Sequence, residues 1–154
     1  MPDALDLRKV ISGKDARLFC TYKGKTVQLA EASSFVAALN PTNADVQPMG
    51  SALIGAVTTG YTITLTITEY VVRDDAMVVP ILEAIKKGEP VLFDFQGVLD
   101  RTAIDGQESR QSFRNCVPDG TIGLMNATPG EVCTRESSFR GNAMPEIIKY
   151  FKAA

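Results

Sequence analysis

The sequence contains no histidine and only three cysteines among its 154 residues. Histidine is the commonest general base, the usual partner of a catalytic serine or cysteine, and the commonest metal ligand. Cys20, Cys116 and Cys133 are odd in number and far apart, with no CxxC or similar ligand spacing. We therefore expect buried, unreactive thiols in a reducing compartment, no metal site and no cofactor.

One long stretch of the sequence also lacks charge, since no charged residue occurs from Val46 to Thr68. This stretch is not a membrane helix, since one proline, several glycines and many threonines interrupt it. An uncharged run of this length suggests that other copies of the protein, rather than water, cover part of its surface. The net charge of −2 argues against a protein that grips the backbone of nucleic acid, because such proteins concentrate lysine and arginine.

The usual catalytic motifs are absent as well. Gly50 and Gly55 have the glycine spacing of a P-loop, but no GKS or GKT follows. Asp94, Asp100 and Asp105 lie along one expected strand and its loop, where solvated side chains explain them better than a metal or acid–base pair. We predict a protein that is not an enzyme and has no catalytic residues.

What the sequence does contain is a segment of strict alternation, Tyr61 to Tyr70. Its aliphatic residues alternate with threonines, and a strand places such sets on opposite faces. We expect one buried face and one polar, uncharged face. The aliphatic set is Ile63, Leu65 and Ile67, and the exposed set is Thr62, Thr64, Thr66 and Thr68.

The first third of the chain predicts a polar arm over residues 1–13 and then β structure. A hairpin is expected over 16–22 and 26–30, closed by Lys23-Gly24-Lys25, with a further strand over 31–39 that brings Phe35 and Val36 to the core. The cluster 40–43 interrupts this strand. The glycine-rich run 48–60 is interpreted as a flexible hairpin tip or loop, within an extended assembly loop over 40–60.

One internal helix is expected after Asp74 and Asp75, which supply the N-cap and favourable charge. Pro80 requires either a start near Val79 or an irregular first turn. Gly88 terminates the helix. Its apolar stripe comprises Val78, Ile81, Leu82 and Ile85.

The remainder predicts strands over 90–100, 111–117 and 132–140, with a turn at 118–120. Pro145 opens a short terminal helix with Ile147, Ile148, Tyr150 and Phe151 as its apolar face. The whole chain, 1–154, is therefore predicted to form one mainly β or α+β domain, a β-barrel or two-sheet sandwich with one flanking helix.

Ile11–Phe19 resembles the N-terminal I-S-G-K-x-G-R-L-F-type signature of tail tube proteins from contractile-tailed phages, defective prophages and tail-like bacteriocins of Gram-positive bacteria. Other short features resemble that family in the same order along most of the chain. They are Met49-Gly50, Thr59-Gly60 before the threonine-rich strand, Lys87-Gly88 before Val91–Phe93, Arg110-Gln111, Glu136 with Phe139 and Gly141, and Ile147–Phe151.

The resemblance implies a subunit that forms rings of six, which stack into the inner tube of a tail or tail-like particle assembled in the bacterial host cytoplasm. The implied partners are further copies of the chain, a tail sheath protein, and tape measure and baseplate proteins, with DNA as a transient passenger and no membrane binding. The candidate lumen face is Thr62, Thr64, Thr66 and Thr68. The candidate inter-subunit loop contains Pro48, Met49, Gly50, Leu53, Ile54, Gly55 and Val57.

Three alternatives remain at this point. A tube of a type VI-like or extracellular contractile injection system would share the same architecture. A small β-barrel binding module would use the threonine face to line a ligand cavity. A cysteine-dependent enzyme would need Cys116, near Arg114, as an activated thiol without a histidine base.

Overall fold

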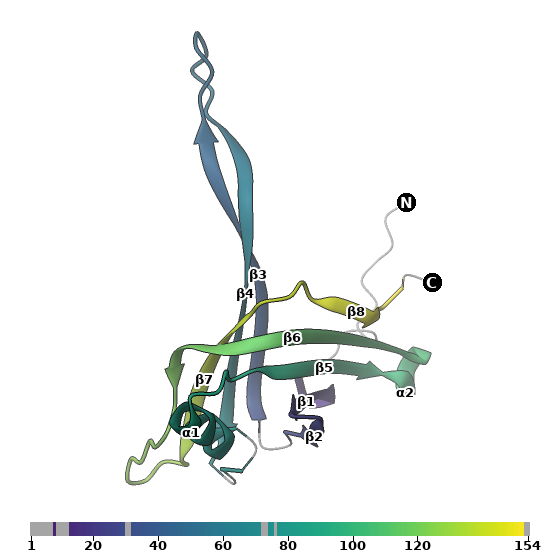
Figure 1. Cartoon of the computed structure of the whole chain (residues 1–154). Coiled ribbons are helices and arrows are strands. Elements are labelled where there is room, and N and C mark those ends of the chain that lie inside the picture. The colour runs from purple at the N-terminus through teal and green to yellow at the C-terminus, as the bar shows by residue number, and fades with distance from the viewer. Residues whose placement is uncertain (1–7, 9–12, 30–31, 72–73, 76, 153–154) are drawn as a thin grey trace.

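The computed structural model describes residues 8, 13–29, 32–71, 74–75 and 77–152. These residues form eight strands in one antiparallel sheet with two helices and a 3-10 turn (Figure 1), which confirms the predicted mainly β fold. The strand order is β2-β1-β5-β6-β7-β4-β3, with β8 paired to β6. The elements are η2 (Gly13–Asp15), β1 (Ala16–Tyr22), β2 (Lys25–Gln28), β3 (Ala32–Val46), β4 (Gly55–Tyr70), α1 (Val78–Lys87), β5 (Phe93–Arg101), α2 (Thr102–Asp105), β6 (Gln107–Ile122), β7 (Thr134–Gly141) and β8 (Glu146–Lys149).

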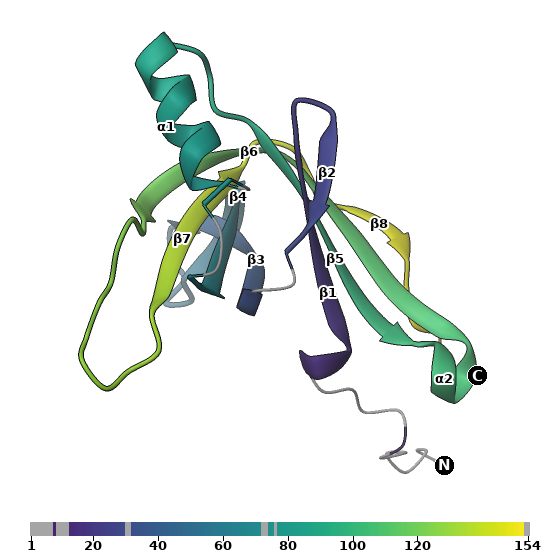
Figure 2. The ribbon, with the colours of Figure 1, turned by 90° about the horizontal axis from the view of Figure 1, so that it is seen from below.

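The sheet bends so that its two halves face each other across the core (Figure 2). Phe35 of β3, the last strand of the path, makes an edge-to-face contact with Phe113 of β6 at 5.9 Å between ring centroids. Its ring also lies beside Gly97 of β5, where an added Cβ would come within 3.3 Å of it. The architecture therefore resembles the expected sandwich, although both halves belong to one continuous sheet.

Aromatic and aliphatic side chains from both halves fill the core. Phe95 and Phe139 are fully buried with ring centroids 4.9 Å apart, and Phe93 lies 5.8 Å from Phe139. Each buried side chain of this size stabilises the fold by roughly 1.5–3 kcal/mol. The aliphatic residues of β4 complete the cluster, as the alternation predicted.

The long β3 strand differs from its prediction in two ways. The expected break at 40–43 is absent, because β3 runs to Val46 and absorbs the irregularity as a register shift between Thr42 and Asn43. Pro41 is tolerated since β3 is an edge strand of the sheet. Val36 is exposed rather than in the core, because it follows inward-facing Phe35 in an extended strand and must face the other way.

Helix α1 begins at Val78, which leaves Pro80 in the first turn where no N–H is required. The predicted caps Asp74 and Asp75 precede Met77, which occupies the N-cap position without a side-chain hydrogen bond. Gly88 adopts the left-handed conformation at the C-cap, as predicted. The buried face is Val78, Ile81 and Ala84, so the predicted stripe is wrong for Leu82 and Ile85, which are exposed.

Two further predictions at the C-terminal end are wrong. Residues 118–120 form no strand-ending turn, because β6 continues to Ile122 and accommodates Pro118 at a register shift against β7. The expected terminal helix is instead the short strand β8, which pairs with residues 110–112 of β6. Most of the predicted arm 1–13, including Ile11 and Ser12 of the signature, lies outside the described residues.

Candidate assembly surfaces

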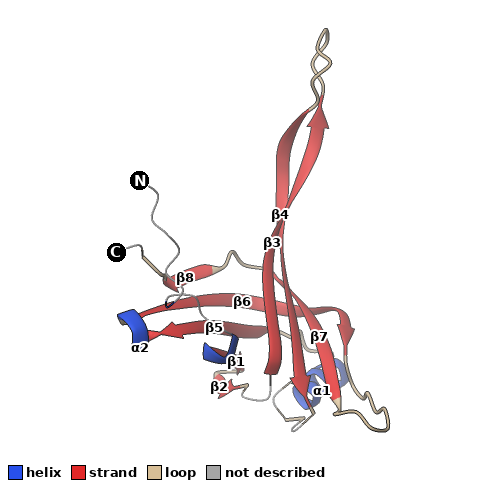
Figure 3. Ribbon diagram, turned by 180° about the vertical axis from the view of Figure 1, so that it is seen from behind, coloured by secondary structure: helices blue, strands red, loops and turns tan. Residues whose placement is uncertain are grey.

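The β3–β4 hairpin extends far beyond the rest of the sheet and ends in a tip, residues 47–54 (Figures 1 and 3). The tip is ordered by its own hydrogen bonds. The Gln47 side chain donates to the Ser51 carbonyl at 3.1 Å, and the Leu53 N–H donates to the Ser51 hydroxyl at 3.1 Å. Gly50 has a φ of 79°, which a residue with a side chain rarely adopts. The chain therefore forms a defined turn here.

The tip presents apolar side chains to solvent. Met49 is fully exposed at 103%, and Leu53 and Ile54 are 76% and 58% exposed. The structure places all seven residues of the predicted inter-subunit loop in this exposed region, but Gly55 and Val57 belong to β4 rather than to a loop. Exposed apolar side chains gathered on one element make the tip a candidate interaction surface.

The shaft of the hairpin is held by polar cross-strand contacts instead of a core. Thr58 donates to the Asn43 side chain at 2.9 Å, and Asn40 donates to the Thr64 hydroxyl at 3.0 Å. Both pairs join β3 to β4. Such contacts align the two strands, and the Thr58–Asn43 pair does so where both residues are exposed.

The alternation predicted for the threonine-rich strand is confirmed. Ile63, Leu65 and Ile67 are buried, whereas all four threonines are partly exposed on the opposite face. The same face continues onto β7, where Arg140 lies opposite Thr64. The further cross-strand neighbours are Ser138 and Glu136 of β7, and Ser34, Val36, Ala38 and Asn40 of β3.

A buried ion network fixes the base of the hairpin, and the sequence pattern did not indicate it. Glu69 follows the aliphatic residues on the inward face of β4, and its carboxylate accepts a hydrogen bond from Arg135 Nε at 2.8 Å. Arg135 also pairs with Asp74, from the segment before α1. Burial disfavours the charge on Arg135, but the hydrogen bonds with Asp74 and Glu69 raise its pKa above the ordinary value.

The two buried thiols, Cys20 and Cys116, lack the features of nucleophiles. Cys20 and Cys116 are buried as predicted, and burial raises the pKa of each to about 12, with a smaller contribution from Asp94. The hypothesis of an activated Cys116 is therefore wrong. Cys133 is exposed, contrary to prediction, because it lies in the loop before β7.

The acidic residues considered as a metal site have separate partners. Asp94 accepts a hydrogen bond from the Asn115 N–H at 3.0 Å, and Asp105 pairs with Arg101 at 2.8 Å. The Thr102 hydroxyl and N–H donate to Asp100 and lower its pKa. No group of three or more potential metal ligands occurs in the part of the chain that the structure describes. No helix among those residues is long and apolar enough to span a membrane.

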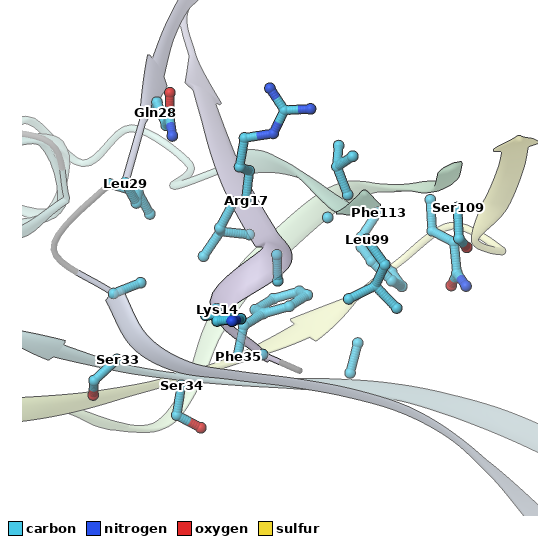
Figure 4. Close-up of a pocket in the computed structure, with 18 residues that line it drawn as sticks. Lys14, Arg17, Gln28, Leu29, Ser33, Ser34, Phe35, Leu99, Ser109 and Phe113 are labelled. Atoms are coloured by element: carbon cyan, nitrogen blue, oxygen red, sulfur yellow. The ribbon is translucent and has the colours of Figure 1, made fainter. Parts of the chain in front are cut away.

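A cleft of about 670 Å³ lies between the start of β3 and the strands β1, β5 and β6 (Figure 4). Apolar side chains from both halves of the sheet line its floor, and none of the four threonines is among its lining residues. The binding-module hypothesis, in which the threonine face lines a cavity, is therefore wrong for this cleft. The principal apolar lining residues are Leu18, Leu29, Phe35, Ala37, Leu99 and Phe113.

Known protein structures share this fold. The SPP1 tail tube protein superimposes with a TM-score of 0.67 at 11% identity, covering 93% of this chain and 81% of that one. The sheath–tube complex of an extracellular contractile injection system, PVC, contains a chain with a TM-score of 0.65 at 10% identity, covering 92% and 95%. A chain of the anti-feeding prophage baseplate superimposes with a TM-score of 0.62 at 8% identity, covering 97% of this chain and 97% of that one.

Sequence relatives occur in Bacillus subtilis strain 168. The phage-like element PBSX protein XkdM is 34% identical over 97 residues, and the uncharacterized protein YqbM is 33% identical over the same length. Each alignment spans 63% of this chain and 63% of the relative. The family model described as phage tail tube protein matches residues 3–143. This match extends over nearly the whole chain, which therefore belongs to the phage tail tube protein family.

Proposed function

We propose that the chain is a structural subunit that polymerises as stacked, six-membered rings into the inner tube of a contractile phage tail or phage tail-like particle. The observation that supports this most directly is the apolar tip, which a member of the tail tube family holds far from its own core. A lone subunit leaves these side chains in water, and contact with another subunit removes them from it.

The threonine face is the proposed wall of the channel. Its four threonines are uncharged, and Arg140 and Glu136 beside them on β7 have opposite charges. A wall without a concentration of lysine and arginine does not retain DNA through counterion release, so DNA or ions pass without being held. The polar β-branched side chains also suit a strand face in contact with water.

The proposed partners are the other components of a tail. A tail sheath would surround the tube, tape measure protein would occupy it during assembly, and baseplate proteins would contact its end. Among the solved structures that share the fold, one is a sheath–tube complex and another is a baseplate. Assembly takes place in the cytoplasm of the bacterial host, and the product is part of a virion tail or tail-like particle.

Negative-stain microscopy of the purified protein, with sedimentation over a range of concentrations, tests the proposal. We expect rings and tubes whose mass increases with protein concentration. A strictly monomeric protein at high concentration, even when sheath protein or a preformed tube seed is added, would contradict it.

A further inference from the structure

Strand β6 has one edge that is covered in two different ways along its length. β5 pairs with the opposite edge of β6 along residues 107–116. β7 pairs with the edge in question at residues 116–118 and 122, and the short strand β8 pairs with it at residues 110–112 (Figure 1). An uncovered strand edge presents a row of N–H and C=O groups that can pair with another chain. β8 therefore covers the part of the β6 edge that β7 leaves open.

The attachment of β8 depends on charge, since all four of its residues are exposed. Lys149 pairs with Glu108 of β6 at 2.9 Å, and Glu146 pairs with Arg114 of β6 at 3.0 Å. These two ion pairs hold the two ends of the strand. The side chains of Arg114, Glu146 and Lys149 are 62%, 59% and 60% exposed. Dissolved salt therefore screens both pairs.

The residues that follow β8 add two contacts near the start of β6. The Lys152 N–H donates to the Gln107 side chain at 2.7 Å, and the guanidinium carbon of Arg101 lies 4.1 Å from the centre of the Phe151 ring. Residues 146–152 thus form a strap along β6. The strap is held mainly by polar and charged contacts, which are weaker in water than the packing of a core.

The edge beneath the strap is complementary to itself. When two copies of β6 pair antiparallel about a two-fold axis at Gln111, Glu108 of each copy lies opposite Arg114 of the other. Arg110 then lies opposite Ser112, so no like charges face each other directly. Glu108 and Arg114 are the same two residues that pair with the strap. The strap and a second copy therefore compete for one edge and for the same two charges.

We infer that the strap is an autoinhibitory cover, which prevents the edge of β6 from pairing with the same edge of a second copy. The inference goes beyond the proposed function and does not depend on it, because the cover acts within a single subunit. A contact between identical edges is isologous and closes after two subunits. Such a dimer would withdraw subunits from an open polymer, so the strap leaves other surfaces free to direct assembly.

Reversal of the two strap charges tests the inference. In Glu146→Lys/Lys149→Glu, each strap residue faces a like charge on β6, while the net charge of the chain is unchanged. We expect amide hydrogen exchange in residues 146–149 to become at least tenfold faster. We also expect dimers in sedimentation experiments, at concentrations where the wild-type chain is a monomer. Circular dichroism checks that the variant is folded.

A compensating variant and a control separate the strap from a general effect of charge. Addition of Glu108→Lys/Arg114→Glu to the reversed strap restores both ion pairs with opposite polarity, and should restore slow exchange and the monomer. The matched control, Glu83→Lys/Lys87→Glu, reverses two exposed charges on α1 and should behave as the wild type. Persistent dimers in the compensated variant, or dimers in the control, would overturn the inference.

A cysteine on the two-fold axis tests the register. Gln111→Cys is added to the reversed strap in a Cys133→Ala chain, which removes the exposed native thiol. Residues directly opposite each other in an antiparallel pair are close enough for a disulfide, so we expect disulfide-linked dimers on mild oxidation. Thr26→Cys, on the edge strand β2, is the matched control in the same background and should remain monomeric.

The wild-type chain offers a measurement that needs no substitution. Because salt screens the two ion pairs, exchange in residues 146–149 should become faster as salt concentration rises. Exchange that does not respond to salt would overturn the inference. So would a folded variant whose strap exchanges rapidly without forming dimers, or whose dimers do not crosslink through position 111. Failure of the wild-type chain to form tubes would contradict the proposed function alone.

Discussion

Arg135 lies in an environment that its chemistry disfavours, because the charged guanidinium is almost completely buried. The carboxylates of Glu69 and Asp74 offset the loss of hydration. Together they join β4, β7 and the segment before α1. Glu69, the charged residue that ends the apolar alternation of β4, therefore has a structural role that the alternation itself does not reveal.

We expect Arg135→Met to lower the free energy of unfolding by about 3–5 kcal/mol, because the substitution leaves the Glu69 carboxylate buried without its guanidinium. Urea denaturation followed by circular dichroism measures the change. The double variant Glu69→Gln/Arg135→Met removes both charges and should recover part of the loss. A single variant as stable as the wild type would show that the buried pair does not hold the hairpin base.

The buried thiols predict a dependence of stability on pH. Burial raises the pKa of Cys20 and Cys116 from an unfolded value of 9.0 to about 12. Between these values the unfolded chain loses thiol protons that the folded chain retains, so unfolding is favoured as pH rises. Stability is thus unaffected by these thiols below about pH 9 and falls between about pH 9 and about pH 12.

Urea denaturation at a series of alkaline pH values measures this fall. In the double variant Cys20→Ala/Cys116→Ala the curve should be flatter over the same interval, although cavities lower its stability at neutral pH. Cys133→Ala is the matched control, since this thiol is exposed, and should follow the wild-type curve. Equal slopes in all three proteins would contradict the prediction.

At the scale of elements, the alternation of apolar and polar residues predicted the buried part of β4. It gave no such signal for the distal part of β3, which has no buried face. The alternation in β4 is a consequence of burial, so Ile63 to Ile67 could be assigned from sequence. The distal part of β3 has no core to pack against, and its Asn-Pro-Thr-Asn cluster resembles a turn. Cross-strand pairing with β4 overrides that signal, and pairing partners are not visible in a single segment.

The same limitation explains the C-terminal errors. Pro118 and Gly120 favour a turn locally, but β6 pairs with β7 up to Pro118 and again at Ile122, and the register shift between these two residues absorbs the irregularity. Ile147 and Ile148 fit a helix face as well as a strand, and pairing with β6 decides between them. The cleft could not be predicted at all, because its lining comes from distant strands that meet only when the sheet bends.

The apolar tip predicts an effect on assembly that is separate from folding. The triple variant Met49→Ser/Leu53→Ser/Ile54→Ser changes only exposed side chains, so we expect the unfolding free energy to change by less than about 0.5 kcal/mol. Tube formation should be lost, because the variant removes the apolar surface that contact with a second subunit would bury. Electron microscopy measures tube formation and thermal unfolding measures stability.

The control for this variant is Ile104→Ser, which alters a comparably exposed apolar residue on α2. It should form tubes normally. Point substitutions are preferable to deletion of 48–59, since β4 begins at Gly55 and such a deletion removes paired residues. Normal tubes from the triple variant would exclude the tip as a contact between rings.

At the scale of the whole molecule, the bent sheet separates three surfaces with different chemistry. The inward face holds the core and the cleft, the outward face of β4 and β7 is polar, and the tip lies apart from both. In the proposed tube this separation matters, because the tip would join subunits while the threonine face would contact what passes through the channel.

The proposed channel wall makes a prediction about the assembled tube. Thr64→Lys/Thr66→Lys adds two positive charges per subunit on the partly exposed face, where the longer side chains can extend into solvent. We expect the variant to fold and form tubes but to retain DNA, because lysines that contact phosphates release counterions on binding. Retention should weaken steeply as salt concentration rises. Co-sedimentation of tubes with short DNA at several salt concentrations measures it.

The matched control distinguishes position from charge. Val79→Lys/Leu82→Lys adds the same charge on the exposed side of α1, a different element from the proposed wall. Tubes of this control should bind DNA only on their accessible outer surface, so nuclease treatment should remove the DNA. In the threonine-face variant, DNA inside the channel should resist the nuclease. If DNA bound to both variants is digested equally, the threonine face does not line the channel.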